Sequence, residues 1–104
     1  MKATKANVTK VLKAARLSQH RNDSYNAYSR VGFTSQDFGS DIVLEYWNKP
    51  EFHGKSNLNG HTERTLQDLE IAMARMLNAL QAAGMDAVRN PERNDQIIIS
   101  KAVA

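Results

Sequence analysis

The chain has 104 residues, of which 41% are hydrophobic, which is enough for one hydrophobic core and too little for two. It contains no cysteine, so disulfides, thiolate metal sites and cysteine nucleophiles are excluded. The net charge of +3 is unevenly spread, because residues 1–40 carry seven Lys and Arg against two acids, and residues 41–104 carry seven against nine. We therefore predict a single domain over residues 1–104 whose basic amino-terminal part is attracted to polyanions or acidic protein surfaces.

No secretory signal or membrane-spanning segment is expected, because no long apolar run follows the basic amino-terminal residues. The sequence therefore predicts a cytoplasmic location and no membrane partner.

The first expected element is a short amphipathic helix that extends to about residue 18. Apolar side chains recur at helical spacing at Val8, Val11, Leu12 and Ala15. Basic side chains fall mainly on the opposite side, at Lys5, Lys10, Lys13 and Arg16. This distribution predicts that the positive charge is displayed to solvent. Residues 19–30 have no periodicity and are expected to form a loop.

Two strands are expected next, over residues 31–38 and 42–47, on either side of a tight turn at Gly39-Ser40. The second strand alternates, so Ile42, Leu44 and Tyr46 share one face. We expect that face to be buried, because the opposite face includes Glu45. Residues 48–61 contain Pro, Gly, Asn and Ser without periodicity and are predicted to be the longest loop.

A long helix is predicted from Thr62 or Thr65 to residue 83, and Gly84 is expected to cap it in a left-handed conformation. Its apolar residues follow at spacings of three and four: Leu66, Leu69, Met73, Met76, Leu77 and Leu80. Two further strands, residues 85–89 and 96–103, are expected around the turn-rich residues 90–95.

These elements predict an α+β fold, a two-layer sandwich in helix-hairpin-helix-hairpin order (αββαββ) with a four-stranded, mostly antiparallel sheet. Both helices would cover one face of the sheet, and the other face would be partly wet. Strand alternation cannot place all of four apolar residues in the core, so some of them would lie on the wet face: Val43, Trp47, Val88 and Ile98. An exposed patch formed by some of them would be a binding surface or a homodimer interface.

No motif indicates a reaction, a cofactor or a metal. The three histidines, His20, His53 and His61, lack partners at metal-ligand spacing, and Gly54-Lys55-Ser56 lacks the first glycine of a phosphate-binding loop, because Lys49 stands in its place. The serines Ser18, Ser24 and Ser35 have no nucleophile-elbow context. The acidic Glu63, Asp68 and Glu70 suit the positive end of the long helix. We therefore predict that the protein is not an enzyme and needs no cofactor.

Three segments carry a resemblance to known proteins: the first helix around residues 8–15, the segment Ala-Leu-Gln-Ala-Ala-Gly-Met-Asp-Ala-Val at residues 79–88, and the final Ile97-Ile98-Ile99 strand. They resemble parts of small uncharacterised bacteriophage proteins, especially those of actinobacteria. The resemblance implies an accessory protein that acts on host machinery or on phage gene expression in the host cytoplasm. It assigns no catalytic residue.

Two kinds of partner remain open. The first is a host or phage protein, bound through the basic first helix, the exposed sheet face or the loop around Tyr46, Trp47 and Phe52. The alternative is a nucleic acid, with the cations on phosphates and Tyr25, Tyr28 or Trp47 available for stacking. Against the alternative, the net charge is modest and no helix-turn-helix or RNA-recognition motif is present. The candidate contact residues are Lys2, Lys5, Lys10, Lys13, Arg16, Arg21, Tyr25 and Trp47.

Overall fold

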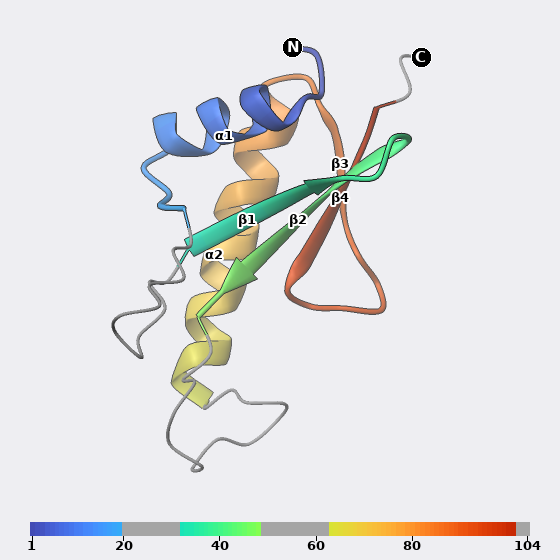
Figure 1. Ribbon diagram of the computed structural model, residues 1–104. Coiled ribbons are helices and arrows are strands. Elements are labelled where there is room, and N and C mark those ends of the chain that lie inside the picture. Colours follow the sequence, from blue (N-terminus) through green and yellow to red (C-terminus); the bar gives the residue numbers. More distant parts are fainter. Residues whose placement is uncertain (20–31, 49–62, 102–104) are drawn as a thin grey trace, which may run out of the picture.

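The computed structural model describes residues 1–19, 32–48 and 63–101 (Figure 1). The elements in chain order are α1 (Lys5–Ala14), β1 (Gly32–Asp37), β2 (Asp41–Trp47), α2 (Glu63–Ala82), β3 (Asp86–Arg89) and β4 (Gln96–Ser100). The strands form one antiparallel sheet in the order β1-β2-β4-β3. The predicted α+β class and the four-stranded antiparallel sheet are therefore confirmed. The loops were expected over residues 19–30 and 48–61, and all of their residues except Gln19 and Asn48 lie outside the described residues.

The core lies between α2 and the two central strands. Ile42 pairs with Ile99 and Leu44 with Ile97 across β2 and β4, and all four side chains are fully buried. The residues of α2 that are fully buried opposite them are Leu69, Met73, Met76 and Leu80. Their spacing of three and four keeps them on one side of the helix, as the sequence predicts. Leu66 and Leu77 lie at the margin of this stripe and are half-buried.

Helix α1 lies on the same face of the sheet as α2, and it packs against α2 and β1 (Figure 1). Its Val8 and Leu12 are fully buried, and Thr4 caps its first turn by accepting a hydrogen bond from the Asn7 N–H through its hydroxyl. The helix ends at Ala14, earlier than the predicted residue 18. Leu17 is still buried, because the chain turns back toward the core after Ala15.

Helix α2 ends as predicted at Gly84, which has a φ of 82°. The Gly84 N–H donates to the Gln81 carbonyl over 3.0 Å, and the Met85 N–H donates to the Leu80 carbonyl over 3.1 Å. This pair of bonds is the Schellman motif, in which buried Leu80 and Met85 supply the accompanying apolar contact. Because Met85 belongs to this motif, β3 begins one residue later than predicted.

An ion pair joins α2 to the edge strand β3. Two nitrogens of Arg89 donate to the two carboxylate oxygens of Glu70 over 2.8 and 2.9 Å. These bonds lower the pKa of the Glu70 carboxyl, which is half exposed. A bidentate pair of this kind adds orientation as well as energy.

We predict that Met76→Ala and Leu80→Ala each lower the free energy of unfolding by about 2–5 kcal/mol, because each change leaves a cavity between α2 and the sheet. Asn78→Ala on the exposed side of the same helix is the control and is expected to change it by less than about 0.5 kcal/mol. Urea denaturation measures all three. Unchanged midpoints for both core variants would contradict the core assignment.

The Glu70–Arg89 pair should contribute to the pH dependence of stability. The lowered pKa of folded Glu70 means that its contribution is present above the unfolded value of about 4.3 and is lost as the pH falls through the folded value. Because the pair is largely solvent-exposed, the contribution is below about 1 kcal/mol. Glu70→Gln should therefore lower stability slightly at pH 7 and reduce the loss between pH 5 and 3, as followed by urea denaturation. An equal acid loss in both proteins would exclude the pair as a cause.

Candidate partner-binding surface

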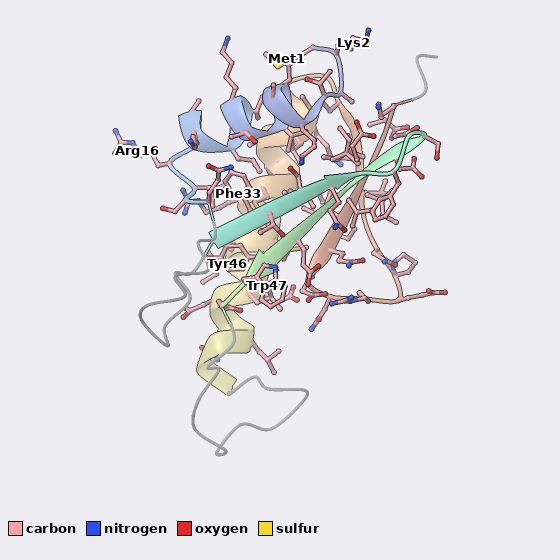
Figure 2. The ribbon with its side chains drawn as sticks, in the orientation of Figure 1. Met1, Lys2, Arg16, Phe33, Tyr46 and Trp47 are labelled. Carbon is pink, nitrogen blue, oxygen red and sulfur yellow. The ribbon has the colours of Figure 1, made fainter. Side chains whose placement is uncertain are left out.

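The cations predicted to contact a partner gather on α1 and its flanks. Those in the described residues are all exposed and are named here the α1 basic face: Lys2, Lys5, Lys10, Lys13 and Arg16. Figure 2 shows Lys2 and Arg16 at opposite ends of α1, with Trp47 well away from both at the end of β2. Trp47 is half-buried. The structure therefore does not bring Trp47 together with the basic residues, and Arg21, Tyr25, Tyr28 and Phe52 lie outside the described residues.

The basic residues at the start of α1 do not stabilise the helix. The first turn contains Lys5 and no acid, although the positive end of a helix favours acidic side chains. Lys13 in the last turn is favourably placed beside the negative end. With Val8 and Leu12 facing the core, Lys10 and Lys13 project from the outer side of the helix. The basic face is thus a consequence of amphipathic packing.

Three of the described cations outside α1 form salt bridges, and Arg75 does not. Outside α1, Arg89 is paired with Glu70, Arg93 with Glu45 and Asp95, and Lys101 with Asp37. No residue of the α1 basic face forms a salt bridge with a side chain of residues 1–19, 32–48 or 66–101. The basic charge of α1 is therefore available to an external anion.

Arg16 occupies a strained position at the end of α1. Its φ is 64°, in the left-handed region that disfavours residues with a Cβ atom. The Arg16 N–H donates to the Lys13 carbonyl and the Leu17 N–H donates to the Leu12 carbonyl, over 2.9 and 3.0 Å. This is the same Schellman motif that ends α2, except that arginine stands where α2 has glycine. An arginine at this left-handed position places a charged side chain on the surface, and its strained backbone lowers local stability relative to glycine.

Arg75 of α2 extends the positive charge at this end of α1. Its guanidinium donates to the Ala15 carbonyl over 2.8 Å, which satisfies one of the terminal carbonyls of α1. Sequence reasoning missed this residue as a contact candidate. Its position between the core residues Met73 and Met76, on the polar side of the helix, was the available signal.

A hollow of about 350 Å³ opens beside this charge, between α2 and the ends of α1 and β2. We call it the α2 hollow, and its lining residues are Leu17, Tyr46, Asn48, Asp68, Ile71, Ala72 and Arg75. Figure 2 shows Tyr46 at this end of β2. Burial is the main cause that raises the pKa of the Tyr46 hydroxyl; nearby Asp68 raises it further, and Arg75 opposes the shift. The lining of the hollow is therefore mainly apolar, and it includes the exposed side chains of one acid and one base, Asp68 and Arg75.

The open face of the sheet is the other predicted contact surface. The strand register places Val43, Ile98 and Val88 in one row across β2, β4 and β3. Val88 is 54% exposed, whereas Val43 and Ile98 are half-buried. The row is bordered by Glu45, which accepts a hydrogen bond from Arg93 over 3.3 Å. The predicted apolar patch is present, but it is narrow.

Only some of the residues considered for metal, nucleotide and catalytic roles lie within the described part of the chain. Among the described residues, no three His, Cys, Asp or Glu side chains lie close enough together to hold a metal ion. The three histidines and Gly54-Lys55-Ser56 lie outside those residues. Asp68 and Glu70 are exposed on α2, Ser18 is exposed after α1, and Ser35 is half-buried in β1.

The chain matches no protein-family model, and no curated protein or solved structure is detectably similar to it. Of α1 and the described part of α2, neither is both long and apolar enough to span a bilayer. The resemblance to bacteriophage proteins therefore stays a prediction.

We predict that Arg16→Gly raises the free energy of unfolding by about 0.5–1 kcal/mol, because glycine adopts the left-handed conformation without a steric cost. Ala14→Gly, two residues earlier in regular helix, is the matched control and should lower it by up to about 1 kcal/mol. Thermal and urea unfolding measure both. A destabilised Arg16→Gly variant would show that the side chain, and not the backbone, dominates at this position.

Proposed function

We propose that the chain is a small non-enzymatic binding protein, of the phage accessory type, that contacts an acidic host or phage protein through the α1 basic face. One observation carries the proposal: the α1 cations and the adjacent Arg75 are exposed and form no salt bridge with the described residues, whereas Arg89, Arg93 and Lys101 are all paired. The exposed Arg16, which stands at a left-handed backbone position where glycine would be less strained, supports it. The proposed place of action is the host cytoplasm.

We include in the proposal that the fold is a two-layer αββαββ sandwich. In this arrangement α1 lies in the helical layer, and its side away from the core is accessible to a large partner. The fixed contacts of Val8 and Leu12 orient the lysines before binding, so little ordering of the helix is needed.

A protein partner suits the surroundings of the basic face better than a nucleic acid does. Asp68 lines the α2 hollow together with Arg75, and it would repel a phosphate backbone that continued past the end of α1. A protein surface carries charges of both signs and apolar side chains, and it can match this mixture. Binding to nucleic acid through the same cations is the competing outcome.

The test compares the native protein with a variant carrying Lys10→Gln, Lys13→Gln and Arg16→Gln. The control carries Gln36→Glu, Gln67→Glu and Asn78→Glu, three exposed positions away from α1, which change the net charge by the same amount. Each protein is used as bait in its source cells, with and without nuclease, and the captured partner is then titrated in purified form. We expect at least a tenfold loss of affinity, mostly in the association rate, for the α1 variant alone.

Nucleic acid is tested directly by titrating duplex DNA at several salt concentrations. If the three cations contact phosphates, the α1 variant should flatten the slope of log affinity against log salt by about two to three units. Tight DNA binding at physiological salt with that change in slope would replace the protein partner by a nucleic acid. Equal capture by the α1 variant and the native protein would show that the basic face is only solvated.

A further inference from the structure

The outer side of α2 carries a short pattern that the α1 surface does not explain. We call it the α2 stripe, and its residues are Asp68, Ile71, Ala72 and Arg75. Their spacing of three, four and seven places them along one side of the helix. Ile71 is 62% exposed, although it is a large apolar residue. Asp68 and Arg75 are exposed on either side of it.

Asp68 and Arg75 are poorly placed to neutralise each other within one copy. Seven residues of α-helix separate them by about 10 Å along the axis, which is beyond the reach of a direct ion pair for most side-chain conformations. Neither forms a salt bridge within the described part of the chain. Arg75 uses one donor on the Ala15 carbonyl, and a guanidinium has five. That bond holds the guanidinium in place and leaves donors for another carboxylate.

The stripe is complementary to itself in one orientation only. The midpoint between Asp68 and Arg75 falls between Ile71 and Ala72. When two α2 helices are placed antiparallel about a two-fold axis at this midpoint, each Asp68 faces the Arg75 of the other copy. A parallel arrangement would instead place like charges together. A two-fold axis repeats every contact, so two ion pairs flank one apolar centre.

The α2 hollow offers room for the exposed apolar residue. All four stripe residues line it, and Leu17 and Tyr46 add to the apolar lining that Ile71 and Ala72 supply. Its volume of about 350 Å³ exceeds that of a single branched aliphatic side chain. Asp68 and Arg75 line the same hollow, so both charges of the stripe lie beside the space that Ile71 would enter.

We propose that two copies of the chain associate through antiparallel α2 stripes, with Asp68 of each paired to Arg75 of the other and Ile71 of each entering the other's α2 hollow. The carrying observation is the juxtaposition of a self-complementary charge pair, an exposed isoleucine and an adjacent apolar hollow. The contact involves one helix from each copy, so the dimer is a weak one that forms at micromolar or higher concentrations. Its formation does not require the partner bound by the α1 basic face.

The test uses charge reversal and mixing. Asp68→Arg makes both ends of the stripe positive, and Arg75→Asp makes both negative, so each variant alone should be monomeric in sedimentation velocity at about 0.5 mM, where the native chain dimerises. An equimolar mixture of the two variants should form a heterodimer, because each stripe is then complementary to the other. The doubly exchanged variant, with Asp68→Arg and Arg75→Asp in one chain, should regain the homodimer.

Two further variants distinguish association through the α2 stripe from association through the open sheet face. Ile71→Asp should weaken dimerisation at least tenfold without lowering the melting temperature of dilute protein, and Val88→Asp on the sheet face should leave dimerisation unchanged.

If Arg75→Asp impairs folding through loss of the bond to Ala15, Arg75→Gln takes its place, alone and mixed with Asp68→Arg. A native chain that is monomeric at about 0.5 mM, a dimer that survives Asp68→Arg and Ile71→Asp, or a dimer lost in Val88→Asp would each overturn the proposal.

Discussion

The contact between one side of α2 and the central strands β2 and β4 is the constraint on which the other positions depend. These strands are far apart in the chain, and they pair with both apolar faces turned toward the same helix. Each edge strand precedes its central neighbour in the chain and is joined to it by a hairpin, with Gly39 at a φ of 90° in the first one. Helix α1 can bury Val8 and Leu12 only in the space left beside α2 and over β1. The direction in which α1 displays its cations therefore follows from the packing of α2.

The same packing leaves the sheet edges poorly suited to recruiting another strand. At the β3 edge, the Ala87 N–H donates to the Met85 carbonyl, and the Ala87 carbonyl accepts from the Gln81 side chain. At the β1 edge, the Phe33 N–H donates to the Ser18 carbonyl. Backbone groups used in this way cannot extend the ladder, which is how many proteins prevent edge-to-edge association. Contacts with other molecules are thus favoured through side-chain surfaces, chiefly the α1 basic face and the α2 stripe.

The sequence was sufficient for those features that depend on local periodicity. The four fully buried leucine and methionine residues of α2, its Gly84 cap and the alternation of β2 were all predicted, because each is encoded within a few neighbouring residues. The predicted end of α1, at residue 18, was wrong. Ala15 and Leu17 continue the apolar pattern, but the positive φ of Arg16 ends the helix. No periodicity marks that change. The part played by Arg75 was missed for a different reason: its bond joins residues 60 positions apart, and only the folded arrangement of α1 and α2 brings them together.

Arg75 connects the two proposed surfaces physically. Its guanidinium holds the Ala15 carbonyl at the end of α1, next to Arg16, and it also forms one end of the α2 stripe. In the proposed dimer, Asp68 of the second copy would neutralise Arg75 and reduce the repulsion among the cations at this end of α1. The outward lysines of α1 would not be covered, because Lys10 and Lys13 project from the side of α1 that faces away from the core. Two basic faces would then act together on one partner, so that a weak contact at each face gains strength from the higher effective concentration of the other.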